Sequence, residues 1–214
     1  MRKFTCSLLV IALVMVMTTA SLAQVSMGMG GLLGLNFATV GGKDSNNPVA
    51  PENKTGFAIG GFLSFSIANM LTLEPQLLFM QKGATGKGSV NNTTVDYTVS
   101  YNYLEVPVLV KLNIPLAGNV AVKPNVFAGP AFALRVGTPN VNSKSSTQTV
   151  DQDIQNSSST DFGLVFGAGA RFPGFMSGIL VDLRYTLGLS TIDDSAANLE
   201  IKHRVFSVLV GVTL

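Results

Sequence analysis

The sequence predicts an all-β protein, namely an eight-stranded antiparallel up-and-down transmembrane β-barrel with short periplasmic turns and long extracellular loops. Charged residues make up 12% of the chain and hydrophobic residues 47%, whereas a soluble domain typically has about 25% charged residues. No apolar run after residue 23 reaches the roughly 18 residues that a membrane helix needs. Short segments in which apolar and polar residues alternate recur instead, as in membrane barrels.

Residues 1–23 are predicted to be a cleaved secretory signal. Arg2 and Lys3 precede an apolar run from Ser7 to Met17 that is too short for a comfortable membrane span. Small residues at the end of the segment, up to Ala23, match the positions that a signal peptidase reads. The alternative is a retained membrane anchor.

The mature chain is then predicted to be one barrel domain, residues 24–214, exported to the outer membrane. Without the two cations of the signal, the 14 basic residues become 12 and balance the 12 acidic residues. A nucleic-acid partner therefore has no electrostatic basis. Cys6 is the only cysteine and leaves with the signal, so no disulfide and no Cys-ligated metal is expected.

Eight segments after the signal are long enough to cross a bilayer, which takes about 9–11 residues. The first alternates glycines with larger residues, and the fourth carries Leu104, Val106, Val108, Val110 and Leu112 on one face. The others alternate in the same way, with the sixth rich in glycine and the eighth rich in valine. The predicted strands are 27–40, 56–68, 71–82, 98–114, 120–136, 161–172, 178–190 and 200–214.

The connections alternate in length, which predicts short turns in the periplasm and long loops outside the cell. The short connections are 69–70, 115–119 and 173–177, and the long ones are 41–55, 83–97, 137–160 and 191–199. The segment 137–160 is so polar that no regular structure is expected there. The segment 83–89 superficially resembles a phosphate-binding loop, but Gln81 stands where that motif needs glycine. A plain polar loop is predicted.

Four prolines fall inside predicted strands: Pro75, Pro107, Pro124 and Pro130. Proline cannot donate to a strand ladder, and a closed barrel has no edge strand. Each is therefore expected to mark a bulge or a strand end.

The apolar alternates are expected to face lipid, because a charge facing hydrocarbon at mid-depth costs about 2–4 kcal/mol. The charged alternates then form a polar network that fills the barrel interior and leaves no wide channel. Centring hairpins on the short turns places Lys111 opposite Lys123, with Glu74 as their counter-ion, and Asp182 diagonal to Arg171. The predicted interior network is Glu74, Glu105, Lys111, Lys123, Arg135, Arg171, Asp182 and Arg184.

Lys202 and Arg204 share a parity that points outward at the upper rim of the last strand. They are either solvated charges at a strand end or contacts for lipopolysaccharide phosphates.

Catalytic, metal and cofactor sites are not expected. His203 is the only histidine, with Ser207 further along the same face and Asp193 and Asp194 in the preceding loop. Nothing in this spacing selects a nucleophile and its base, so a structural role is favoured. One histidine and scattered carboxylates make no metal-ligand cluster.

The segment Tyr103-Leu-Glu-Val-Pro-Val-Leu-Val-Lys-Leu112 resembles a strand of the PorT-like, or "porin family", small outer-membrane β-barrels of the Bacteroidota. Phe127-Ala-Gly-Pro130, Phe166-Gly-Ala-Gly-Ala-Arg171 and Asp182-Leu-Arg-Tyr185 resemble later strands of that group. The resemblance implies the barrel fold, and most members of the group have no assigned task. Its founding member is tied to assembly of a protein secretion system.

Three functions remain open. The first is a non-enzymatic outer-membrane barrel, surrounded by lipid and lipopolysaccharide, whose loops contact a protein partner, in secretion or surface assembly. The second is a soluble lipocalin-like ligand-binding barrel with charges outside and an apolar cavity. The third is a membrane-embedded hydrolase centred on His203.

Overall fold

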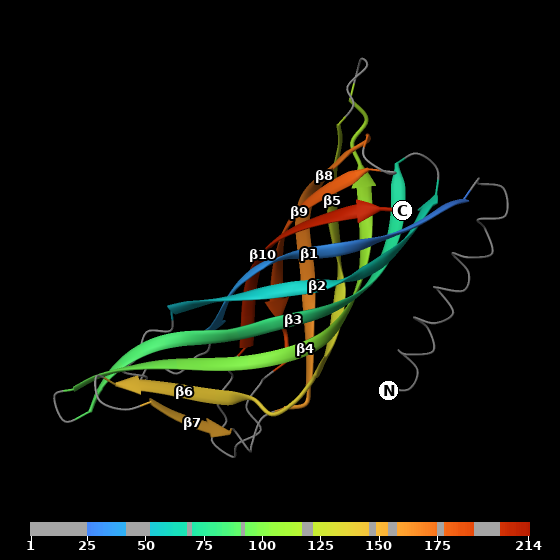
Figure 1. Ribbon diagram of the computed structural model, residues 1–214. Coiled ribbons are helices and arrows are strands. Elements are labelled where there is room, and N and C mark those ends of the chain that lie inside the picture. Colours follow the sequence, from blue (N-terminus) through green and yellow to red (C-terminus); the bar gives the residue numbers. More distant parts are fainter. Residues whose placement is uncertain are drawn as a thin grey trace, which may run out of the picture.

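The computed structural model describes residues 25–41, 52–67, 70–90, 93–116, 122–145, 149–153, 158–174, 178–190 and 202–214. The predicted signal, residues 42–51 of the predicted loop 41–55, and the whole predicted loop 191–199 lie outside these residues. Ten strands are described (Figure 1): β1 (Val25–Gly41), β2 (Glu52–Ile67), β3 (Leu71–Val90), β4 (Thr93–Asn113), β5 (Lys123–Arg135), β6 (Asn140–Ser145), β7 (Thr149–Asp153), β8 (Thr160–Phe172), β9 (Ile179–Gly188) and β10 (Lys202–Thr213).

Eight of these strands close into a ring, which confirms the predicted fold class. The strand order is β3-β2-β1-β10-β9-β8-β5-β4, and pairing of β3 with β4 completes the circle. Every neighbouring pair in the ring is antiparallel. Closure removes the edges that an open sheet would expose.

The two faces of the ring differ as the alternation predicts. On β4, Leu104, Val106 and Val110 point outward and are 36–45% exposed, whereas Tyr103 and Glu105 point inward and are at most 1% exposed. Outward apolar residues on the other ring strands continue this band, which we call the lipid belt. No helix among the described residues is long and apolar enough to cross a membrane.

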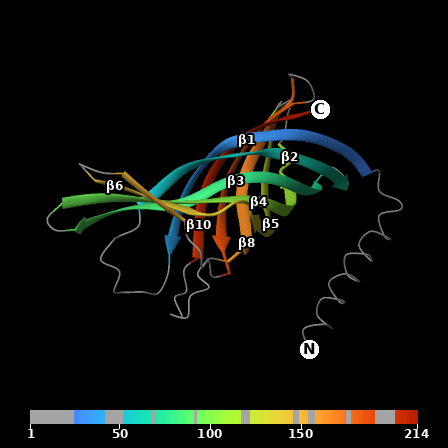
Figure 2. The ribbon, with the colours of Figure 1, turned by 60° about the horizontal axis from the view of Figure 1, so that its bottom comes forward.

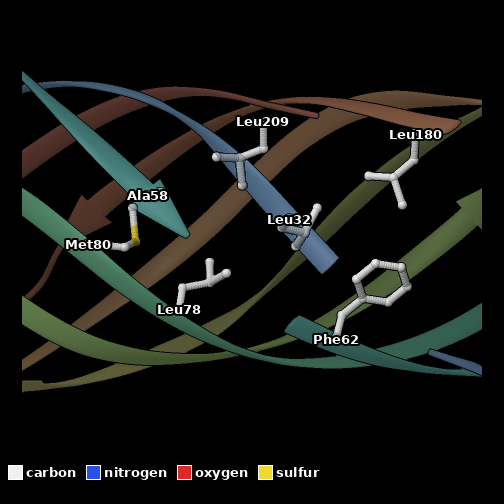
Figure 3. Packing of buried hydrophobic residues seen from close by; sticks show 7 residues of the cluster. All are labelled: Leu32, Ala58, Phe62, Leu78, Met80, Leu180 and Leu209. Atoms are coloured by element: carbon white, nitrogen blue, oxygen red, sulfur yellow. The ribbon is translucent and has the colours of Figure 1, made fainter. Parts of the chain in front are cut away.

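Apolar side chains also fill part of the interior. One cluster joins residues of β1, β2, β3, β9 and β10 (Figure 3), and a second, smaller cluster joins β4, β5 and β8. Their members are Leu32, Ala58, Phe62, Leu78, Met80, Leu180 and Leu209 in the first, and Leu109, Phe127, Ala131 and Val165 in the second.

The proline prediction is right for one residue and wrong for three. Pro124 lies at the start of β5. Pro75, Pro107 and Pro130 lie within strands, and the register is unchanged on either side of each. Each falls where one of its two ladders lacks cross-strand pairs, in β2–β3, β3–β4 and β4–β5 respectively. The N–H that proline lacks thus interrupts one ladder of hydrogen bonds, while the strand continues without a change of register. No bulge, with its extra residue, is therefore needed.

The predicted register of the β4–β5 hairpin is wrong. Lys111 lies opposite Phe127, and Asn113 lies opposite Asn125, so Lys111 and Lys123 do not face each other. The prediction began the fifth strand at 120, whereas β5 begins at Lys123, and the longer connection shifts every pair. In the β8–β9 hairpin, Asp182 lies opposite Gly169, which makes it diagonal to Arg171 as predicted.

Three predicted loops contain strand residues. In the predicted loop 41–55, Gly41 ends β1 and residues 52–55 begin β2. Residues 83–90 belong to β3 and residues 93–97 to β4, and these continue their pairing to Val90↔Thr93. The segment 137–160 contains β6 and β7, which pair with each other and extend the sheet from β4. Valine, threonine and tyrosine favour strands even where lipid is absent. These segments extend away from the ring in Figures 1 and 2.

Candidate functional site: the interior and the sheet above it

A closed cluster of charges occupies the interior toward the short-turn end of the ring. Lys111 Nζ of β4 lies 2.9 Å from Glu74 Oε1 of β3 and 3.0 Å from Asp182 Oδ2 of β9. Arg184 Nη2 lies 3.3 Å from the same Asp182 oxygen. Gln76 Nε2 donates to Glu74 Oε1 at 2.7 Å, and its Oε1 accepts from Arg184 Nη1 at 2.9 Å. We call these five residues the lower cluster.

The lower cluster is electrically neutral and buried. It holds two carboxylates and two cations, and each of its four charged side chains is at most 7% exposed. Phe127 lies under both cations, with its ring centroid 5.0 Å from Lys111 Nζ and 5.8 Å from Arg184 Cζ. Buried charges survive in a low-dielectric interior only when paired in this way. The cluster therefore cross-links β3, β4 and β9 through the barrel.

A second group of charges lies toward the other end. Lys82 Nζ of β3 is 2.6 Å from Glu105 Oε2 of β4 and 3.5 Å from Asp161 Oδ2 of β8. The same ammonium lies 5.0 Å from the ring centroid of Tyr103. Ser190 Oγ donates to Asp161 Oδ1 at 2.8 Å. These residues form the upper cluster, which links three strands in the same manner.

His203 is packed among aromatic rings. It is fully buried, edge-on to Tyr101 and Tyr103, and its Nε2 lies 3.4 Å from the Tyr103 hydroxyl. Ser207 Oγ has no hydrogen-bond partner in the described structure, so no base activates it. Asp193 and Asp194 lie outside the described residues. The geometry gives His203 a packing role and gives no positive sign of catalysis.

The remaining predicted interior residues take different positions. Lys123 is exposed and Arg171 half-buried at the short-turn end, and neither belongs to an ion pair among the described residues. Arg135 is half-buried opposite Tyr103, and its side chain takes part in an interaction within the structure. At the other end, Lys202 and Arg204 lie beside Gly41 and Thr39 of β1 on the outer face, as the parity predicts.

The predicted network omitted Gln76, Lys82 and Asp161, which complete the two clusters, although Gln76 shares the inward parity predicted for Glu74. Lys82 shares the inward parity of Glu74 on the same strand, so alternation alone could have placed it. Its proximity to the strand end concealed it, because the third strand was expected to stop there. The described residues contain no group of three or more His, Cys, Asp or Glu side chains able to hold a metal ion.

A small sheet projects beyond the ring. The part of β4 from Thr93 to Asn102 lies past its last pair with β5, and it pairs with β3 on one side and β6 on the other. β7 pairs with β6 beyond it. We call β6, β7 and the adjoining parts of β3 (Gly83–Val90) and β4 the projecting sheet.

The outer face of the projecting sheet is polar. Lys87, Asp96 and Lys144 lie in one row across three strands. In the next strand, Asp151 Oδ1 accepts a hydrogen bond of 2.6 Å from Asn142 Nδ2. No lipid belt reaches this region, because outward positions of β4 change from apolar to polar above Leu104. The projecting sheet therefore lies in water.

A family model and several solved structures are similar to this chain. A model of the outer membrane protein β-barrel domain matches residues 22–194. Ail, the attachment invasion locus protein of Yersinia pestis, is 16% identical with a TM-score of 0.44 over 87% of this chain and 98% of its own. Neisserial surface protein A is 12% identical with a TM-score of 0.47, covering 89% and 99%.

A third solved structure, OprG from Pseudomonas aeruginosa, is 11% identical with a TM-score of 0.48, covering 88% of this chain and 95% of its own. A search of curated proteins found no match.

Proposed function

Because the chain belongs to the outer membrane protein β-barrel domain family, we propose that it is a non-enzymatic outer-membrane barrel that presents its projecting sheet to a protein partner outside the cell. The family and the closed ring place the protein in the outer membrane. Short turns lie on the periplasmic side in such barrels, so the projecting sheet is on the cell surface.

The observation that carries this proposal is the position of the projecting sheet. Two ring strands, β3 and β4, continue past the lipid belt, and β6 and β7 extend the sheet there. The row of Lys87, Asp96 and Lys144 offers alternating charges and donors on a surface that is already ordered. A preformed polar surface binds a partner without the cost of ordering a loop.

Two further parts of the proposal concern the surroundings of the barrel. Lys202 and Arg204, on the outer face at the top of the lipid belt, are proposed to contact lipopolysaccharide phosphates. The resemblance of residues 103–112 to the PorT-like group supports a role for the partner contact in protein secretion or surface assembly.

A photo-crosslinking experiment tests the partner contact. A photoreactive amino acid would replace Lys144 on the projecting sheet in cells. As a matched control, the same residue would replace Leu112, which is exposed on the lipid belt of the ring. We expect a discrete protein adduct from position 144 and none from position 112. Identical adducts from both positions, or none from several positions of the projecting sheet, would refute the proposed contact.

The hydrolase alternative is tested by replacing His203 with alanine. Burial keeps this side chain away from any substrate, so we expect no activity of the wild type that the H203A variant lacks. Hydrolysis assays of the purified wild type and H203A on acylated lipids and esters would detect any such activity. An activity that disappears in H203A would revive the enzyme hypothesis.

A further inference from the structure

A polar cavity of about 510 Å³ opens at the short-turn end of the ring. Its lining includes Lys123 of β5, Arg171 of β8, and Asn113 and Asn125 beside them. The lower cluster lies at its inner side, since Lys111 also lines the cavity. Because the short turns are periplasmic, the cavity faces the periplasm.

Lys123 and Arg171 lie directly opposite each other in the β5–β8 ladder. Like charges in this arrangement destabilise a sheet. No carboxylate among the described residues lies within ion-pair distance of either. The ring therefore carries two facing cations at its mouth with no counter-charge from the described structure.

Among the described residues, no spare side-chain carboxylate lies at this end of the barrel. Glu74 and Asp182 already pair with Lys111 and Arg184 in a neutral set. The sequences that connect the strands at this end, residues 68–70, 114–122 and 173–178, contain no aspartate or glutamate. No described side chain therefore neutralises Lys123 and Arg171, which leaves both cations open to an anion from another molecule or from solution.

We propose that Lys123 and Arg171 bind a phosphate group at the periplasmic mouth of the barrel. An arginine fork and a lysine ammonium are the usual partners of phosphate, and Asn113 and Asn125 add neutral hydrogen-bonding groups. The cavity exceeds the size of one phosphate, so the ligand has room for further atoms. The lower cluster on the inner side is neutral, so the unpaired charges that attract the phosphate are those at the mouth.

A phospholipid headgroup of the inner leaflet and a soluble phosphate compound share this chemistry. The first arm of the test measures binding of inorganic phosphate to the full barrel, purified from outer membranes in a nonionic detergent at low salt. The variant K123Q/R171Q removes both cations, and K123R/R171K is a matched control that exchanges the two side chains and keeps both charges. We expect K123Q/R171Q to bind phosphate at least tenfold more weakly, and the charge-preserving control to retain phosphate binding.

The second arm measures binding of phosphatidylglycerol to the delipidated barrel by native mass spectrometry, with diacylglycerol as the neutral comparison. A headgroup ligand gives phosphatidylglycerol adducts that K123Q/R171Q lacks. A soluble ligand gives phosphate binding without a difference in lipid adducts. Equal behaviour of wild type and K123Q/R171Q in both arms overturns the proposal. A gel-mobility shift on boiling verifies that each variant is folded.

Discussion

The ring and the projecting sheet share β3 and β4, yet the two regions place polar and apolar residues by different rules. Within the lipid belt, β4 places Leu104, Val106 and Val110 outward and buries Glu105 inward. Above the belt, the same strand places Asp96 and Thr98 outward and half-buries Val95 and Tyr97. The backbone pairing with β3 is continuous through both regions. What changes is the surrounding solvent, which decides which face of a strand is polar.

The largest effect is expected where the ring differs most from the projecting sheet, in its buried charges. Replacing Asp182 with alanine leaves Lys111 and Arg184 short of one negative charge inside the barrel. Breaking a buried pair costs about 3–5 kcal/mol, and we expect a loss of that size in the free energy of unfolding. Urea unfolding in lipid vesicles, followed by far-UV circular dichroism, measures it.

Replacing Asp96 with alanine is the matched control, because it removes a carboxylate from the water-exposed sheet. Its expected cost is below about 0.5 kcal/mol. If D182A and D96A unfolded at the same urea concentration, the lower cluster would contribute nothing measurable to the free energy of unfolding.

A second substitution pair compares the two regions along one strand. Arginine at Val110 faces hydrocarbon and is expected to cost about 2–4 kcal/mol. Arginine at Thr98, on the same outward face above the belt, is expected to cost under about 0.5 kcal/mol. The same vesicle unfolding assay gives both numbers. Equal costs at the two positions would mean that the belt ends elsewhere.

The smallest effect is expected at the junction between the regions. Gly137 follows β5 with a φ of 78°, a left-handed conformation that costs other residues about 1–2 kcal/mol. An added Cβ would meet no atom within 4 Å, so G137A tests the backbone alone. We expect amide exchange in β6 to accelerate about 5–30-fold while the ring remains unchanged.

Replacing the neighbouring Thr138 with alanine is the control, and hydrogen-exchange NMR follows both variants. Faster exchange throughout the ring in G137A would show that the projecting sheet and the barrel unfold as one unit.

The difference between the regions also explains what the sequence could predict. Alternation with one apolar face identified the ring strands, because lipid requires that face to be almost wholly apolar. The projecting sheet escaped notice because water tolerates threonine, asparagine and lysine outward. Val95, Tyr97 and Val99 alternate with polar residues, as in a strand. The polarity and length of the segment 83–97 nevertheless predicted a loop. The alternation was present, but a strand was expected only where one face was almost wholly apolar, as in a membrane strand.

Which charged side chains pair inside the barrel was harder to predict than which side chains face inward. Parity alone placed Glu74, Lys111 and Asp182 inward. Which charges meet depends on register, and register depends on turn length, which the sequence specified poorly. The β4–β5 hairpin does not pair Lys123 with Lys111, and the β5–β8 ladder places Lys123 opposite Arg171. Two cations at the mouth thus became visible only when three-dimensional pairing was known.

The interior has a consequence for the cell that carries the protein. Arg184, Tyr103, Lys82 and Leu78 are among the large side chains that are almost fully buried inside the ring. Because side chains fill the barrel across its width, the barrel adds little leak to the membrane around it. Among the described residues, the filled interior therefore leaves solutes no wide path through the barrel.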